Sequence, residues 1–356
     1  MADIKFFKRL RFIGGIRNER NKMQVATIFY EQVNNPPSLK VVDSAKIYNE
    51  VDWLPSGNLI YNVTPKSNIR AAFSRTLARP DFVERSPYIY FDFPEQVEVV
   101  GQGALQITRI KNYDLRFEYY PTGGEIFSAS LFYKNFDNPV ERFFNLGNPS
   151  NSVEYKNLNS AVAKGFELDV RKSLAFIFPA SPVFKSLMIS SNFTYLSGEI
   201  AYLVTKVPGT GRDTSYVANA KRPIQGLSPY IVNAGLSYQQ DNWGLNLAFN
   251  RSGRKIVNGG TNETLIQYEN PRNILDLQVN AKLFKQKCEL RLNFGDILNQ
   301  PFIIYSNNLN KDTNGGYPGE GKNSDPKGAA FNEKHDFVNY KVKRGTNVYF
   351  NAIYKF

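Results

Sequence analysis

Apolar and polar residues alternate one by one through long stretches of the chain, most clearly between residues 112 and 136. Before a turn made of Pro121, Thr122, Gly123 and Gly124, the apolar positions are Tyr113, Leu115, Phe117 and Tyr119, and the charged positions are Asp114, Arg116 and Glu118. After the turn, Phe127, Ala129, Leu131 and Tyr133 continue the apolar series. Alternate residues of a strand point to opposite faces of its sheet, so this pattern predicts a β-hairpin with one apolar and one charged face.

The same period of two recurs along the chain and predicts about twelve strands. They are expected near residues 10–17, 53–63, 69–73, 113–119, 127–134, 161–171, 187–196, 230–238, 243–252, 273–283, 288–294 and 347–356. The first strand can be prolonged through Val25 to Tyr30, and a long polar connection is expected from there to about Asp52.

The lengths of the connections indicate how these strands are arranged. Long and short connections alternate along the chain, with one intermediate case between Lys172 and Ser186. Up-and-down pairing would gather the short turns at one end and the long loops at the other, as in outer-membrane barrels, whereas a Greek-key sandwich gives no reason for such sorting.

The charged strand faces favour a wet interior. Faces such as Asp114, Arg116 and Glu118 would cost several kcal/mol per unpaired charge, roughly, in a dry core. The apolar faces are therefore expected to meet lipid, with Tyr119, Tyr133, Tyr238 and Trp243 near the membrane interfaces. The predicted fold class is all-β, a transmembrane antiparallel up-and-down β-barrel of about 12 strands.

Composition narrows the chemistry. The 356 residues include one cysteine, Cys288, and one histidine, His335, which excludes an intrachain disulfide and most metal-site or triad chemistry. The formal charge of +12 comes from lysines and arginines scattered among acids, so no nucleic-acid partner is expected. No apolar run approaches the roughly 18 residues of a membrane helix, and residues 1–21 show no signal peptide.

Several segments resemble the C-terminal barrel region of TonB-dependent outer-membrane receptors, especially those of the Bacteroidota. The segments are Thr76-Leu77-Ala78-Arg79-Pro80-Asp81-Phe82, Asn112-Tyr113-Asp114-Leu115-Arg116, Ser128-Ala129-Ser130-Leu131-Phe132-Tyr133-Lys134, Gly165-Phe166-Glu167-Leu168, Arg222-Pro223-Ile224-Gln225-Gly226-Leu227-Ser228-Pro229-Tyr230, Asp296-Ile297-Leu298-Asn299-Gln300-Pro301 and the terminal Phe356. Their order and spacing cover nearly the whole chain, although Gly103-Ala104-Leu105 stands where the family more often has Gly-Asn-Pro.

The resemblance implies a fold and a function. Receptors of this family are single 22-stranded barrels plugged by an N-terminal domain, and they import scarce ligands such as metal chelates or glycans with energy relayed by TonB. With about twelve strands and no candidate plug, residues 1–356 are interpreted as one partial barrel domain, the C-terminal half of such a barrel. This fragment is not expected to transport alone, and TonB is a partner only if the missing N-terminal part is present.

The location and the remaining partners follow from the same resemblance. The chain is expected in the outer membrane of a Gram-negative cell, where it contacts lipid and is inserted by the barrel-assembly machinery. No enzymatic activity, catalytic residue, metal or cofactor is expected.

Candidate site residues fall in the long loops and in the last strand. The loop residues expected to contact a ligand are Tyr88, Tyr90, Phe91, Tyr216, Arg222 and Tyr317, with packing of loop bases as the alternative. Phe350, Tyr354 and Phe356 are expected to act as the assembly signal, with an ordinary lipid-facing strand as the alternative.

Two other functions are alternatives to the receptor. One is a self-contained twelve-stranded pore. The other is a membrane-embedded hydrolase using His335, although no Gly-x-Ser-x-Gly segment is present. Asn310, Asp312, Asn314 and Gly315 imitate the opening of an EF-hand loop, but Gly321 occupies the position of its closing glutamate.

Overall fold

The computed structural model describes residues 1–34, 37–86, 88–93, 95, 97–145, 152–206, 216–260, 265–307, 330–334 and 336–355. Of residues 26–47, 145 and 202–220 it describes at most the backbone. No helix in these ranges is long and apolar enough to cross a membrane.

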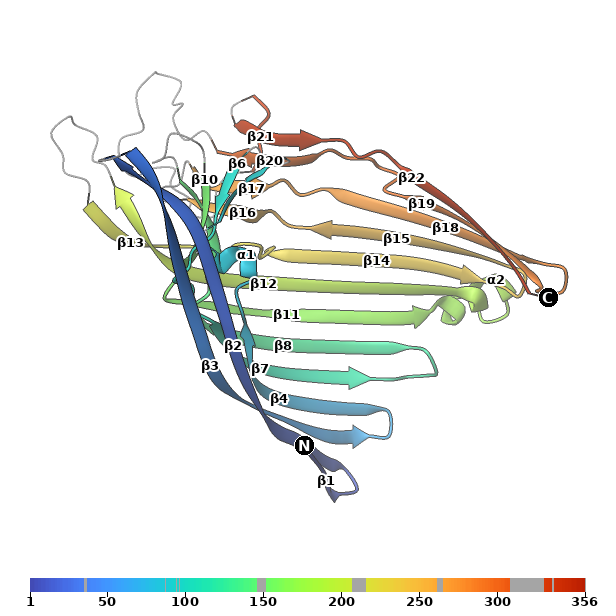
Figure 1. Ribbon diagram of the computed structural model, residues 1–356. Coiled ribbons are helices and arrows are strands. Elements are labelled where there is room, and N and C mark those ends of the chain that lie inside the picture. Colours follow the sequence, from blue (N-terminus) through green and yellow to red (C-terminus); the bar gives the residue numbers. More distant parts are fainter. Residues whose placement is uncertain are drawn as a thin grey trace, which may run out of the picture.

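A curved antiparallel sheet of 14 strands forms most of the molecule (Figure 1). Its strands follow one another in chain order, each pairing with the next one along the sheet. They are β1 (Ala2–Phe7), β2 (Leu10–Asn34), β3 (Pro37–Thr64), β4 (Ser67–Ala78), β7 (Thr108–Tyr119), β8 (Ile126–Asp137), β11 (Ser160–Ser173), β12 (Leu187–Lys206), β14 (Tyr230–Gln239), β15 (Trp243–Ser252), β18 (Asn273–Leu283), β19 (Cys288–Gly295) and β22 (Asn347–Tyr354), with β13 (Tyr216–Arg222) paired to the far end of β12. The predicted up-and-down architecture is confirmed.

The register keeps apolar residues on one face of the sheet. Leu247 of β15 lies directly opposite Leu236 of β14 and Leu277 of β18. Leu115 and Leu131, which face each other across β7 and β8, have 48% and 59% of their surface exposed. Large apolar side chains this exposed, row after row, form a surface suited to hydrocarbon and not a dry protein core.

Short turns and long connections lie at opposite ends of the sheet, as predicted (Figure 1). The short-turn end includes the turn after β18, where Phe284, Lys285 and Gln286 all have positive φ. The intermediate connection, Lys172 to Ser186, carries the 3₁₀-helix η1 (Leu174–Phe176) and the short helix α2 (Pro182–Ser186) at this same end. Outer-membrane barrels have short turns of this kind on the periplasmic side.

The long connections contain a second sheet, which we call the loop-end sheet. Its 8 strands run in the order β21, β20, β17, β16, β9, β10, β6, β5. Their bounds are β5 (Ile89–Asp92), β6 (Val97–Val100), β9 (Val140–Asn145), β10 (Ser152–Asn157), β16 (Lys255–Gly260), β17 (Gln267–Glu269), β20 (Phe302–Ser306) and β21 (Phe337–Val342), and the helix α1 (Phe82–Arg85) precedes them. Two small apolar clusters hold it together, one around Val99 and Val153 and one around Ile256 and Tyr305.

Three features of the sequence interpretation were wrong. The polar connection expected to end at Asp52 is paired β-structure, because β2 and β3 stay in register from Leu10–Tyr61 to Asn34–Pro37. The hairpin strand β1 and the short strands within the long connections were not predicted. The long connections lie beyond the limits of the apolar band, where neither strand face has to be apolar, so no period of two marks them. β1 is different, because Ala2, Ile4 and Phe6 alternate with Asp3 and Lys5 and the pattern for a strand was present there.

The sheet is open. In the described ranges β22 pairs with β19 and no second strand, while residues 10–17 of β2 pair with β3 and, in part, β1. Pairing between β22 and residues 10–17 of β2, which a closed twelve-stranded barrel would require, is therefore not seen among these strands.

Candidate functional site

The polar face of the sheet carries matched charges. Arg116 donates from Nε to Glu118 Oε1 (2.9 Å), from Nη2 to Ser128 Oγ (2.9 Å) and from Nη1 to Ser130 Oγ (3.2 Å). Glu118 also lies 3.0 Å from Nε of Arg70 on the adjacent strand β4. Strands β4, β7 and β8 thus place side chains that satisfy one another on a face that an apolar core could not accept.

Farther along the same face, side-chain amides replace the charges. Asn192 donates to Glu167 Oε1 (2.6 Å), and Asn250 donates to Asn233 Oδ1 (2.6 Å). In a second group, Asn246 donates to Gln278 and Gln278 to Asn293. We call the 14-stranded sheet the wall. Its polar face presents both hydrogen-bond donors and acceptors, which suits a water-filled space through which polar solutes pass.

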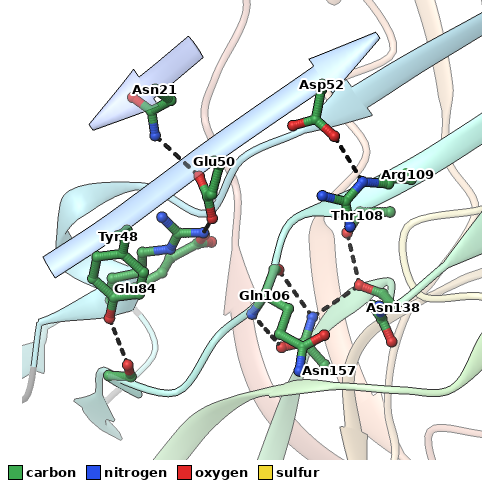
Figure 2. Close-up of polar contacts among 12 residues, drawn as sticks. Asn21, Tyr48, Glu50, Asp52, Glu84, Gln106, Thr108, Arg109, Asn138 and Asn157 are labelled. Carbon is green, nitrogen blue, oxygen red and sulfur yellow. Dashed lines mark hydrogen bonds and ion pairs between the residues drawn. The ribbon is translucent and has the colours of Figure 1, made fainter. Parts of the chain in front are cut away.

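An ion pair joins the helix α1 to strand β3 at the loop end (Figure 2). Arg85 is 1% exposed and donates from Nη2 to Glu50 Oε1 (2.9 Å), while Asn21 donates to the other oxygen of Glu50 (3.1 Å). The Arg85 guanidinium lies 4.2 Å from the centre of the Tyr48 ring, and the Tyr48 hydroxyl donates to the carbonyl of Gly103. The ion pair, the Tyr48 ring and the Gly103 carbonyl together hold the connection between β4 and β7 against β3.

A second group of contacts fixes the start of β7 beside it. Arg109 donates to Asp52 Oδ1 (2.7 Å), and Asp52 is 5% exposed. The Thr108 hydroxyl and the Asn157 amide both donate to the carbonyl of Asn138, at 2.9 and 2.8 Å (Figure 2). Asn157 also exchanges hydrogen bonds with the backbone of Gln106. Strand β3, the connection that leads into β7 and the connection that follows β8 are thus joined at the loop end.

A fully buried ion pair ties the loop-end sheet to β13. Arg222 and Glu141 have 0% and 3% of their side chains exposed, and Nη2 of Arg222 lies 2.5 Å from Glu141 Oε2. Arg222 Nη1 also donates to the carbonyl of Pro223, and the backbone N–H of Gln225 donates to Glu141 Oε1 (2.9 Å). The pair therefore connects β9, β13 and the segment that follows β13.

Burial perturbs several titratable groups at the loop end. It raises the pKa of the Glu84 carboxyl in α1, although the backbone N–H of Asp81 partly offsets the effect. It raises the pKa of Tyr155 on β10 to about 12, so this phenol is neutral at physiological pH. Burial also raises the pKa of Tyr305 on β20.

The structure brings some of the predicted ligand residues together. Tyr88 and Tyr90 stack with ring centres 6.3 Å apart, and Tyr88 and Phe91 are 61% and 44% exposed at the edge strand β5. Tyr90 packs against the apolar cluster around Val99. Arg222 is not part of this aromatic group, and its charge is matched by Glu141. That Tyr88, Tyr90, Phe91 and Arg222 contact a ligand stays a prediction.

Other predicted residues lie elsewhere. Tyr216 begins β13, where its backbone pairs with Lys206. Phe350 and Tyr354 are 65% and 52% exposed on the edge strand β22. The remaining positions, Tyr317, Phe356, His335 and the EF-hand-like segment 310–321, lie outside the described residues.

The contacts of Glu50, Asp52, Arg85 and Arg109 were not predicted. One signal was present, because Tyr48, Glu50 and Asp52 occupy every second position before Trp53 and share a strand face. Within the part of the chain that the structure describes, no group of three or more His, Cys, Asp or Glu side chains could hold a metal ion.

Comparisons with known proteins agree with this architecture. A family model described as TonB dependent receptor-like, beta-barrel matches residues 1–299. The search of the curated proteins found no match.

Solved structures add a likeness of fold. The copper transporter OprC gives a TM-score of 0.59 at 13% identity, covering 98% of this chain and 46% of that one. The ferric-catecholate import receptor Fiu from K12 E. coli gives 0.58 at 11%, covering 99% and 43%. The ferric yersiniabactin uptake receptor FyuA from Yersinia pestis gives 0.57 at 14%, covering 98% and 43%. This chain thus spans less than half the length of each.

Proposed function

The chain belongs to the TonB-dependent receptor-like β-barrel family, and from this premise we propose that it forms part of the wall of a larger import receptor in a Gram-negative outer membrane. The family consists of receptors and not enzymes, in agreement with the sequence interpretation. The motifs quoted above support the finer proposal of a Bacteroidota-type receptor.

One observation carries this proposal: the sheet has an apolar outer face and a charged inner face, with turns and loops sorted to opposite ends. Cross-strand neighbours such as Leu236, Leu247 and Leu277 form the outer rows, and Asn233 and Asn250 belong to the inner ones. A sheet of this kind is satisfied only when lipid covers one face and water the other.

The partial extent of the barrel is supported by the open edges. β1 and β22 stand at the two ends of the strand order, each with one backbone edge facing away from its partner. Unpaired backbone groups are costly in lipid, so we propose that further strands complete the ring and that residues 1–356 are one region of it.

The same proposal assigns the partners. Import energised by TonB requires the part of the receptor that contacts TonB, so TonB is proposed as a partner of the complete receptor. The exposed Phe350 and Tyr354 support recognition of β22 by the barrel-assembly machinery. Ligand contact is proposed for the aromatic group of Tyr88, Tyr90 and Phe91 at the loop end.

Single-cysteine labelling tests the two-faced wall. In a Cys288→Ser background, Leu247→Cys and Asn246→Cys place matched thiols one residue apart on β15, on opposite faces of the sheet. In vesicles, an environment-sensitive fluorophore at position 247 should be quenched by brominated lipid. A membrane-impermeant maleimide should react faster at position 246 when the pore side is open to solution.

The comparison between the two positions decides the outcome. Equal quenching and equal reactivity would reject the proposed wall. Protein that stays soluble without detergent, with position 247 shielded from both reagents, would instead indicate a dry core.

A further inference from the structure

A cavity of about 700 Å³ opens where strand pairing divides near the loop end of the wall. Strand β12 pairs with β14 as far as Tyr195, which faces Tyr230, and from Ile200 onward it pairs with β13. The cavity lies in this fork, and its lining includes Tyr268, Tyr305 and Phe331 at the loop-end sheet.

The register places the rim of this cavity on the outer face of the wall. Arg251 lies opposite Val232 on β14 and shares its face with Leu247, two rows farther along β15. Tyr195 and Tyr230 face each other on that same side, one row nearer the loop end. Residues directly opposite one another in a sheet project from the same face, so these side chains border the surface assigned to lipid.

The rim also coincides with one boundary of the apolar band. On β14, Tyr230 and Tyr238 are eight residues apart (230 to 238), which corresponds to roughly 26 Å along a strand. Tyr238 contacts Trp243, with ring centres 4.7 Å apart, and marks the boundary at the turn end. Barrels of this type carry an apolar band about 25 Å tall between two aromatic girdles, so the cavity lies at the girdle of the external leaflet.

Cationic side chains outnumber carboxylates in the described lining of the cavity. Among the described residues, its lining contains Lys221, Arg222, Arg251, Arg254 and Lys255 and the carboxylate of Glu199. Lys221 and Lys255 lie 3.5 and 2.9 Å from Glu199 and Glu269. Arg222 is matched by Glu141.

Arg251 differs from these residues because its hydrogen-bond partners are neutral. It donates from Nε to the Tyr230 hydroxyl (3.2 Å) and from Nη1 to Asn273 Oδ1 (2.7 Å). These contacts orient the guanidinium without cancelling its charge. Arg254 lines the same cavity, and its guanidinium carbon lies 5.1 Å from the centre of the Tyr268 ring.

Apolar groups complete the lining. Leu227, Pro229, Pro271 and Phe331 contribute to it beside the charged side chains. A small soluble anion gains nothing from such a surface, whereas an amphiphile held at a membrane boundary can place its phosphate on the arginines and its sugar or acyl part on the apolar groups.

We propose that this cavity binds the phosphorylated headgroup of an outer-leaflet glycolipid, with Arg251 as the main phosphate contact and Arg254 as its neighbour. The inference rests on the proposed function, because the outer face must lie in the membrane. The outer-face residue Arg251 is distinct from the polar side chains of the inner face and from the aromatic group on β5.

Lipid retention tests the proposal. The full chain, folded in mild detergent and titrated with bisphosphorylated lipid A, should retain this lipid in native mass spectrometry. Arg251→Gln combined with Arg254→Gln should weaken retention by tenfold or more, roughly, because each removes a cation from a phosphate site. Arg251→Lys should keep most of the binding, and Arg291→Gln, on β19 away from the cavity, should keep all of it.

Three further measurements identify the ligand and distinguish a failure of this proposal from a failure of the barrel proposal. Dephosphorylated lipid A should bind weakly, and inorganic phosphate should not compete at millimolar concentration. Competition by phosphate alone would indicate a soluble anion, and equal retention by all variants would refute the site. Heat-modifiable migration checks folding and insertion independently, so a failure of the barrel proposal shows there and not as a loss confined to the Arg251 and Arg254 variants.

Discussion

Replacing Arg222 by leucine should loosen the loop-end sheet far more than the same change at its neighbour Lys221. Arg222 and Glu141 are 0% and 3% exposed, so the leucine leaves a buried carboxylate without its cation. Lys221 and Glu199 are 73% and 68% exposed and their ends lie 3.5 Å apart, so water replaces the lost partner.

The structure sets the size of the two effects. Removing one partner of a buried ion pair costs about 3–5 kcal/mol, and Glu141 keeps a hydrogen bond from the Gln225 backbone, which favours the lower figure. An exposed pair contributes about 0.5 kcal/mol or less. Replacing both Arg222 and Glu141 by leucine removes the orphaned charge, so the double variant should lie within about 1 kcal/mol of the parent.

Hydrogen exchange measures these differences locally. Because the pair joins β9 to β13, amides of residues 140–144 should exchange about a hundredfold faster in Arg222→Leu, the ratio that ~3 kcal/mol corresponds to. Lys221→Leu should change them about twofold at most. Equal exchange in the two single variants, or a double variant as labile as Arg222→Leu, would refute the buried-pair reasoning.

Three further predictions address the wall, the loop end and assembly. Gly165→Ala should abolish heat-modifiable migration, because a Cβ there would collide with the carbonyl oxygen of Tyr195, whereas Gly123→Ala meets nothing within 4 Å and should leave it unchanged. Burial raises the pKa of the Glu84 carboxyl above its ordinary 4.5, so the folded α1 favours the protonated form and becomes less stable as pH rises from the ordinary pKa to the raised one. Limited proteolysis should therefore find α1 better protected at pH 4 than at pH 8, with a smaller difference in Glu84→Gln. Deleting Phe356 should lower the yield of inserted protein, and unchanged insertion would remove its assigned role as assembly signal.

The wall could be predicted from the sequence because membrane and water impose a strict alternation on it. Every strand expected from that alternation is present, and Leu115, Leu131 and Leu247 occupy the outer face as inferred. The signal in the sequence was therefore the alternation itself, with apolar residues at the positions that face lipid and polar residues at the positions that face water.

The loop end could not be predicted because no such constraint acts there. Its sheet is assembled from short strands far apart in the chain, including the parallel pair of β6 with β10. Pairings such as Arg222 with Glu141 or Arg109 with Asp52 depend on where distant loops meet, and neither residue of a pair indicates the other. Tyr88, Tyr90 and Phe91 were predicted only as aromatic residues of a long loop, and the sequence did not indicate the strand β5 on which they gather.

The first and last strands of the sheet, β1 and β22, each pair on one side only among the described strands, and this has a geometric consequence. In a closed ring, strand number and stagger together dictate the radius. In the complete receptor proposed above, the strands that join β1 to β22 would therefore set the radius of the channel and with it the size of the largest cargo that fits through it.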